Sequence, residues 1–139
     1  MTESAAYRAK ADVTEVLLRY ATGIDRRDWA TFRTVFTADC VLDYGEIGTF
    51  TGVDAVTEFM DRSHAMAGHT MHRLSNIVVT VEGDRATART YVDALILASD
   101  NASGVSAVGI YADDLFRTEQ GWRIARRVFT AVRITTVGG

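Results

Sequence analysis

The apolar residues in the first part of the chain recur with the period of an α-helix. From residue 13 to residue 24 they occupy positions i, i+3, i+4, i+7, i+8 and i+11 and form one stripe: Val13, Val16, Leu17, Tyr20, Ala21 and Ile24. Such a stripe predicts an amphipathic helix with one buried face. After the charged segment 25–28, helical spacing resumes and predicts a second, shorter helix through Trp29, Phe32, Val35 and Phe36.

The segment that follows changes its period. The run "CVLDY" at 40–44 predicts a strand, and "GEIGTFTG" at 45–52 predicts a turn and a short extended piece. We expect a third helix next, with Thr51 as its N-cap and Asp54 three positions later, at the spacing of a capping box. The residues of this helix expected to face inward are Val56, Phe59, Met60 and Ser63.

From about residue 70 the pattern becomes that of β-structure. "MHRLSNIVVTVEGDRATARTYVDALILAS" holds two β-rich runs around the turn signal "EGD", and "GVSAVGIYADDLFRTEQGWRIARRVFTAVRITTV" repeats the arrangement around "EQG". Helices followed by long antiparallel strands predict an α+β fold, with three helices packed on one face of a curved sheet. Partial cover of the concave face would leave an apolar cone, a favourable place for a ligand pocket.

Composition narrows the class of protein. The 139 residues contain no proline and no low-complexity linker, which predicts one domain spanning 1–139. A net charge of −3 gives no reason to expect nucleic acid or a membrane surface as partner. Arginines at 26–27 and 123–127 have acids such as Asp28, Asp113 and Asp114 nearby, so we interpret them as solvated faces.

Compartment and redox chemistry follow from two further observations. Cys40 is the only cysteine, so neither an internal disulfide nor a cysteine-rich metal site is expected. The sequence has no secretion signal and no run of the ~18 apolar residues that a membrane span needs. We therefore expect a cytoplasmic protein.

Three histidines lie close together in the sequence, at positions 64, 69 and 72. Their spacings of five and three residues fit no standard metal-binding motif, so no metal site is expected. His64 and His69 fall at the end of the third helix and in the loop after it, where exposed histidines are ordinary. His72 differs because it begins a strand.

His72 is the candidate general base. Because side chains alternate along a strand, His72 should share one face with Leu74, Asn76 and Val78, and this more apolar row should face the cone. A neutral imidazole in a half-dry pocket can take or give a proton near pH 7. A core histidine bonded to a backbone carbonyl explains the same pattern, and the residues alone leave both interpretations open.

Asp25 is the candidate partner of His72. It lies in "GIDRRDW", where the first helical pattern ends, and helix periodicity does not decide whether it points inward or into solvent. Beside His72, its carboxylate would accept the ring N–H, fix the tautomer and raise the basicity of the other nitrogen.

Phenols are the candidate donors to a substrate oxygen. Tyr44 shares a strand face with Cys40 and Leu42, and Tyr20 and Tyr91 are further candidates. Packing at the edge of a core explains these tyrosines equally well. The sequence has no glycine-rich phosphate loop, GxSxG elbow or CxxC motif, so no cofactor is expected.

The order of these segments resembles a known family. Along the chain, "GIDRRDW", the "DY" strand, "GTFTG", "TMHRLSN", "GDRATARTY" and "QGWRIARR" follow one another as in SnoaL-like proteins of the nuclear transport factor 2 (NTF2)-like superfamily. "D-x-x-D-W" followed by "T-x-H-x-x-x-N" resembles the branch that contains scytalone dehydratase and hexachlorocyclohexane dehydrochlorinase. The resemblance implies an NTF2-like cone in which His72, paired with Asp25, removes a proton in an elimination. It also implies that Tyr44 is a pocket tyrosine.

The chain departs from that branch at three places. Ile24 stands where scytalone dehydratase has a tyrosine. The second pocket histidine of scytalone dehydratase aligns near Leu95 or Ile96, which are both aliphatic. Tyr20 stands where the dehydrochlorinase has a lysine. Neither named reaction is therefore expected to carry over unchanged.

Together these features favour a cofactor-independent, dehydratase-like lyase or isomerase acting on a small apolar molecule that contains a ring. His72, Asp25 and Tyr44 would act on the reacting atoms. The residues expected to bind the substrate are Tyr20, Ile24, Trp29, Phe59, Leu74, Asn76 and Tyr91. Two alternatives stay open: a non-catalytic small-molecule binding module, and a polyketide-cyclase-like enzyme with an acidic base.

The last strands predict self-association. "VFTAVRITTV" at 128–137 carries many Val, Ile and Thr residues that a monomer would hide poorly on the outer face of its sheet. We expect a homo-oligomer, either a dimer or a trimer.

Overall fold

The computed structural model describes residues 1–138 and confirms the α+β class. The helices are α1 (Glu3–Asp25), α2 (Trp29–Arg33), α3 (Val53–His64) and the short 3-10 helix η1 (Gly45–Ile47). The strands are β1 (Phe36–Asp43), β2 (Thr49–Thr51), β3 (Ala67–Glu82), β4 (Arg85–Ala98), β5 (Gly104–Thr118) and β6 (Gly121–Val137). Both predicted hairpin turns, around "EGD" and "EQG", join consecutive long strands.

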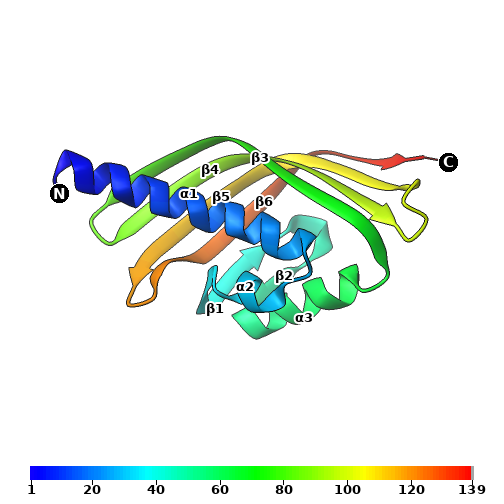
Figure 1. The fold of residues 1–139 in the computed structure, drawn as a ribbon, viewed down its shortest axis with the longest axis horizontal. Coiled ribbons are helices and arrows are strands. Elements are labelled where there is room, and N and C mark those ends of the chain that lie inside the picture. The colour runs from blue at the N-terminus through cyan, green and yellow to red at the C-terminus, as the bar shows by residue number, and fades with distance from the viewer. Residues whose placement is uncertain (139) are drawn as a thin grey trace.

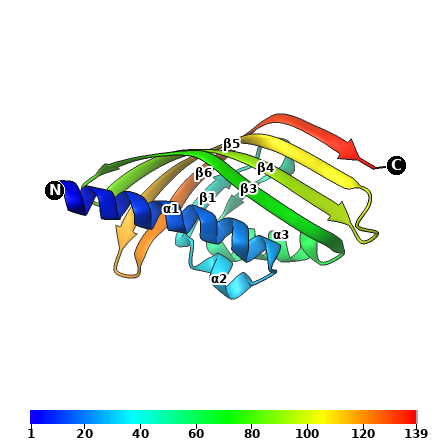
Figure 2. The same ribbon diagram turned by 45° about the horizontal axis from the view of Figure 1, so that its top comes forward.

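All six strands form one curved sheet in the order β2-β1-β6-β5-β4-β3. Neighbouring strands are antiparallel except β1 and β6, which pair in parallel. Figures 1 and 2 show the sheet arching over α1, α2 and α3, which all lie on its concave side. This arrangement is the NTF2-like cone that the sequence predicted.

Helix α1 follows the predicted stripe closely. The Thr2 hydroxyl accepts a hydrogen bond from the Ala5 backbone N–H (3.1 Å) and caps the first turn. Every residue of the predicted stripe is buried against the sheet. In residues 1–138, no helix combines the length and the apolar character that crossing a membrane requires.

Two helix boundaries differ from the prediction. Helix α2 ends at Arg33, and its last predicted position, Phe36, begins β1 instead, although it is still buried. The N-cap of α3 is Gly52, which makes no side-chain capping bond. The prediction of Thr51 as N-cap is wrong because Thr51 is the last residue of β2 and pairs with Val41.

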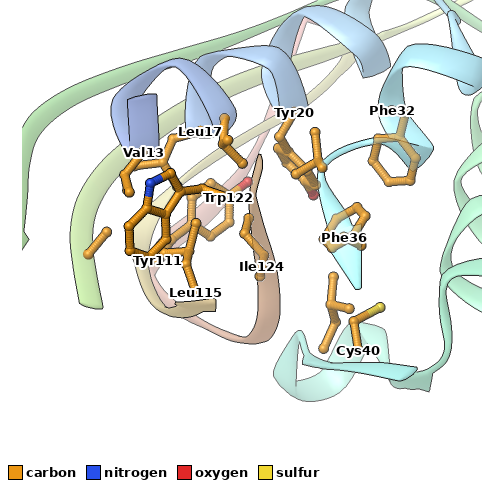
Figure 3. Packing of buried hydrophobic residues seen from close by; sticks show 14 of the residues in the cluster. Val13, Leu17, Tyr20, Phe32, Phe36, Cys40, Tyr111, Leu115, Trp122 and Ile124 are labelled. Atoms are coloured by element: carbon orange, nitrogen blue, oxygen red, sulfur yellow. The ribbon is translucent and has the colours of Figure 1, made fainter. Parts of the chain in front are cut away.

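An aromatic cluster fills the space between α1 and the sheet. Tyr20 of α1 packs against Phe32 and Phe36 on one side and Tyr111 of β5 on the other, with ring centroids 5.4–5.9 Å apart. Figure 3 shows these rings together with the aliphatic side chains of α1, β5 and β6. The cluster fixes how α1 lies over the sheet, and so where its C-terminal end falls.

A bulge in β3 changes which side chains face the helices. Asn76 has a left-handed backbone (φ 49°), and the pairing of β3 with β4 shifts between Ser75 and Val78. Leu74 packs on the core as predicted, but Asn76 and Val78 are exposed, and Ile77 takes the inward position. The inward placement of Asn76 and Val78 is therefore wrong, because the extra residue reverses the alternation.

The C-terminal part of β6 is exposed and apolar in part. Val132 and Ile134 of β6 are 67% and 50% exposed. The predicted exposure is found, but the outward placement is wrong for Ile134, because it pairs with Ala107 on the concave side. The homo-oligomer inferred from this segment stays a prediction.

The bulge gives a test of the backbone at Asn76. Asn76→Val should lower the free energy of unfolding by about 1–2 kcal/mol, because a β-branched residue adopts a left-handed backbone only with strain. Asn76→Gly should be nearly neutral. Urea unfolding measures both, and Ser75→Val, an exposed neighbour on the same strand, is the matched control. Equal stability of Asn76→Val and Asn76→Gly would contradict the described backbone.

Candidate active site

A cavity of about 230 Å³ lies between the helices and the concave side of the sheet. Most of its wall is apolar, and the polar exceptions are histidines, tyrosines and one serine. The lining residues are Tyr20, Tyr44, Ile47, Phe59, Met60, Ser63, His64, His72, Val92, Ala94, Ile96, Ala107, Tyr111 and Phe129. Such a wall suits a small apolar ligand held by a few directed polar contacts.

Asp25 and His72 meet at the edge of this cavity, although 47 positions separate them in the sequence. The Nδ1 atom of His72 lies 2.7 Å from Oδ1 of Asp25, and the backbone N–H of His72 donates to Oδ2 at 2.8 Å. An ionised carboxylate only accepts, so Nδ1 carries the ring proton and Nε2 holds the free lone pair. The histidine side chain is 8% exposed and the aspartate side chain 22%.

Two further residues hold the carboxylate in place. The Thr70 hydroxyl donates to Oδ1 of Asp25 (2.9 Å), and the Arg27 guanidinium donates to Thr70 Oγ1 (2.8 Å) and to the Gly68 carbonyl (2.7 Å). Arg27 also donates to the Ile24 and Asp25 carbonyls at the end of α1. The interpretation of Arg27 as part of a solvated turn is therefore wrong: its left-handed backbone (φ 55°) turns the side chain back onto β3.

These contacts set the charge of Asp25. Partial burial opposes ionisation, but the hydrogen bonds from the His72 ring and backbone, with a smaller one from Thr70, bring the pKa of Asp25 below its ordinary value. The carboxylate is thus ionised at neutral pH and can stabilise an imidazolium on His72.

Tyr20 and Tyr44 form the hydroxyl-bearing part of the wall. Their oxygens lie 2.7 Å apart, so one phenol donates to the other. Burial, followed by the influence of Tyr20, raises the pKa of Tyr44 well above its ordinary value. Tyr44 is therefore a neutral hydrogen-bond donor and not a base.

A buried ion pair supports the tyrosines from behind. Arg127 of β6 donates from Nε and Nη2 to the Asp113 carboxylate of β5 (2.7 and 3.0 Å), and both side chains are fully buried. The guanidinium lies over the rings of Tyr20 and Tyr111, 4.2 and 3.8 Å from their centroids. Burial opposes the charge on Arg127, but the Asp113 carboxylate raises its pKa well above the ordinary value.

The interpretation of Arg127 and Asp113 as solvated is wrong, and the sequence signal differed between the two residues. Asp113 alternates regularly with Tyr111 and Leu115, both buried, so the pattern of β5 already indicated its direction. Arg127 lies three residues after the buried Ile124, so regular alternation would point it outward. It points inward because a bulge between Ile124 and Arg126 shifts the register of β6 against β5. That irregularity had no signal in the sequence.

His64 was predicted to be exposed, and this prediction is wrong. It is the last residue of α3 and is 8% exposed, with its ring near Trp29 and near His72 (centroids 6.1 and 6.5 Å away). Val56, Met60 and His64 follow each other at intervals of four, so the helical stripe could have found it. Burial, with smaller effects of Arg27 and His72, lowers the pKa of His64.

The other predicted site residues divide into two groups. Phe59 lines the cavity, whereas Ile24, Trp29 and Leu74 pack into or against the core and do not line it. Tyr91 is 43% exposed and faces the Arg89 guanidinium (5.7 Å). Its placement in the cavity is wrong because its neighbours on β4, Thr90 and Val92, take the inward direction.

Two aromatic residues of the wall were missed: Tyr111 and Phe129. Both lie on strands whose apolar alternation predicts burial, but nothing in the sequence distinguishes a cavity wall from a filled core. His69 is exposed, as expected, and the half-exposed Asp93 pairs with Arg73 on the surface (2.9 Å).

Comparison with known proteins identifies the family. Residues 5–128 match the model of the SnoaL-like domain, so the chain belongs to this family of NTF2-like proteins. An uncharacterized protein of Mycobacterium tuberculosis is 30% identical over 123 residues, which cover 87% of this chain and 84% of that protein.

Solved structures share the fold. A protein of Novosphingobium aromaticivorans assigned as an aromatic ring hydroxylase has a TM-score of 0.84 and 28% identity, with 94% of each chain covered. One assigned as a scytalone dehydratase, from the same organism, has a TM-score of 0.82 and 21% identity over 90% of this chain and 85% of that one. A hexachlorocyclohexane dehydrochlorinase has a TM-score of 0.89 and 16% identity over 99% and 95%.

The contacts of Asp25 predict a pH-dependent stability. Asp25→Asn should lower the free energy of unfolding by about 1–3 kcal/mol at pH 7, because one of the donors around the carboxylate loses its acceptor. Since the pKa of Asp25 is lower in the folded chain than its ordinary 3.8, this contribution is complete above that value and is lost as the pH falls below it. Urea unfolding at several pH values between 7 and 3 measures the difference.

Asp93→Asn is the control for that series, since Asp93 is half exposed and its ion pair lies on the surface. Its effect should stay small throughout. A destabilisation by Asp25→Asn that does not change with pH would contradict the ionised, hydrogen-bonded carboxylate.

The buried ion pair predicts a strong asymmetry between single and double variants. Asp113→Asn should cost about 3–5 kcal/mol because it leaves the Arg127 charge buried without its counter-ion. The double variant Asp113→Leu, Arg127→Met should recover most of that loss. Denaturant unfolding provides the comparison, with exposed Asp114→Asn as control; equal losses in the single and double variants would argue against the pair.

Proposed function

We propose that this protein is a cofactor-independent lyase or isomerase in which His72 removes a proton from carbon. The observation that carries the proposal is the 2.7 Å contact between His72 Nδ1 and the Asp25 carboxylate, with the same imidazole in the wall of an apolar cavity. In a site of this kind the carboxylate fixes the tautomer and the free ring nitrogen becomes the base.

The reaction would follow from the charges of the two residues. Nε2 of His72 takes the proton, the ring becomes an imidazolium, and the ionised Asp25 stabilises that charge without moving. A positioned acid–base group typically contributes ~10²–10⁴ in rate. This suffices for a carbon acid activated by a neighbouring carbonyl or leaving group.

Tyr44 would stabilise the negative charge that moves from the carbon to the carbonyl oxygen when the proton is removed. When a proton α to a carbonyl is removed, the carbonyl oxygen becomes an enolate oxygen and accepts hydrogen bonds more strongly. The Tyr20–Tyr44 pair places phenolic hydroxyls at the cavity wall. The wall around it is mainly aliphatic and aromatic, which favours a small apolar substrate with a ring.

The names of two similar structures support this proposal. The names dehydratase and dehydrochlorinase denote the removal of water and of hydrogen chloride, and both kinds of protein share this fold. An elimination of either kind includes the loss of a proton from carbon, which is the step assigned here to His72.

The step can be tested without knowing the natural substrate. Ring ketones such as 2-tetralone and 1-indanone, incubated with the protein in D₂O, should exchange their α-protons for deuterium, and proton NMR follows the signal loss. His72→Ala and Asp25→Asn should each slow exchange by roughly 10²–10⁴ while the ketones still bind. His69→Ala, which removes an exposed histidine, is the matched control.

The same variants separate the alternatives. A polyketide-cyclase-like enzyme with an acidic base would lose exchange in Asp25→Asn and keep it in His72→Ala. A pure binding module would bind the ketones without accelerating exchange even as wild type. Either result would refute the Asp25–His72 assignment.

A further inference from the structure

His64 places a second imidazole in the same cavity, and its tautomer is fixed by the helix. Its Nδ1 atom lies 2.8 Å from the Met60 carbonyl oxygen, one turn earlier in α3. Because a carbonyl can only accept, Nδ1 carries the proton and Nε2 is left as an acceptor. The Ser63 hydroxyl lies 3.1 Å from the same Nδ1 and does not change this assignment.

Nε2 of His64 is the unusual atom. It is fully buried, and within residues 1–138 no hydrogen-bond donor reaches it. Buried polar atoms are nearly always paired, since an unpaired one gives up its hydration without compensation. Protonation of Nε2 does not remove the unpaired acceptor, because burial and the nearby Arg27 and His72 lower the pKa of this ring.

The ring is held in place, so a ligand has to come to it. Trp29 packs on it nearly edge to face (6.1 Å between centroids, 62° between planes), and the Met60 bond anchors the other side. The His72 ring lies 6.5 Å away in the same wall. A molecule that presents a C–H to His72 therefore lies beside the His64 ring.

We propose that His64 is a specificity-determining residue that accepts a hydrogen bond from a hydroxyl group of the ligand, so that the substrates are hydroxylated ring compounds. As a statement about substrates it rests on the proposed function, because it uses the same cavity. A neutral hydroxyl fits better than an ammonium group, since the wall carries no carboxylate and is otherwise largely apolar. A ring bearing only ether or halogen groups has no donor for Nε2.

A matched ligand pair tests the assignment by binding alone. 2-Naphthol and 2-methoxynaphthalene differ in one donor proton, and isothermal titration of the full chain gives the affinity ratio for each variant. Wild type should favour the naphthol, and His64→Leu should reduce that preference roughly three- to tenfold, the range of one neutral hydrogen bond. His64→Gln, whose amide oxygen can accept, should retain most of it, as should the control His69→Leu.

The decisive quantity is the change in the ratio between variants, since the two ligands also differ in their own hydration. An unchanged ratio in His64→Leu, or failure of both ligands to bind wild type, would overturn the proposal. Nitrogen-15 NMR of the ring gives a second readout: the Nε2 resonance should shift with 2-naphthol and not with its ether. A resonance indifferent to both ligands would mean that only water meets this atom, and would also overturn it.

Failure of this inference and failure of the proposed function give different results. The titrations require no turnover. A His64-dependent preference in a protein that exchanges no α-protons would therefore refute the proposed enzyme activity and support the hydroxyl-binding site. Exchange that depends on His72, with no His64-dependent preference, would support the proposed enzyme activity and refute the role of His64 in binding a hydroxyl group.

Discussion

The C-terminal end of α1 is tied to the edge strand β3, and the cavity depends on this connection. One carboxylate, that of Asp25, accepts hydrogen bonds from the His72 ring, the His72 backbone and Thr70. A negative charge at a helix C-terminus is unfavourable, because the last carbonyls already carry partial negative charge. Arg27 offsets this by donating to the carbonyls of the last turn and to β3 together.

The aromatic cluster between α1 and the sheet is a second constraint on the cavity, and it depends on a buried charge as well as on packing. Arg127 lies between two tyrosine rings, and its buried carboxylate partner Asp113 keeps it charged. The phenols of Tyr20 and Tyr44 therefore occupy fixed positions beside a permanent positive charge. Removing Asp113 alone would leave the Arg127 charge buried without a partner, which costs about 3–5 kcal/mol.

Most of the fold could be predicted because it follows from regular periods. The stripe on α1, the alternation along β4 and β5, and the two hairpin turns each repeat over many residues, so single irregular positions do not obscure them. The pairing of Asp25 with His72 was expected from the family resemblance and from the need of a half-buried carboxylate for a partner. Helix geometry alone left its direction undecided.

The misplaced residues lie where the period breaks. Asn76 in β3 and Ala125 in β6 each add one residue to a strand, and the side chains that follow change face; in β6 a second bulge at Val132 reverses the alternation again. No pattern in the sequence indicated where these bulges fall. His64 is different: its helical spacing was regular, and the expectation that a histidine at a helix end is exposed outweighed it.

The division of the cavity between elements has a consequence for evolvability. Asp25 and His72 come from α1 and from β3 at the sheet edge, whereas much of the apolar wall comes from β4, β5 and β6. Positions such as Val92, Ile96 and Ala107 make none of the side-chain hydrogen bonds that hold Asp25. The shape of the cavity can thus drift through these strands while the hydrogen-bonded pair at the sheet edge is inherited unchanged, so one scaffold can come to accept a succession of different ligands.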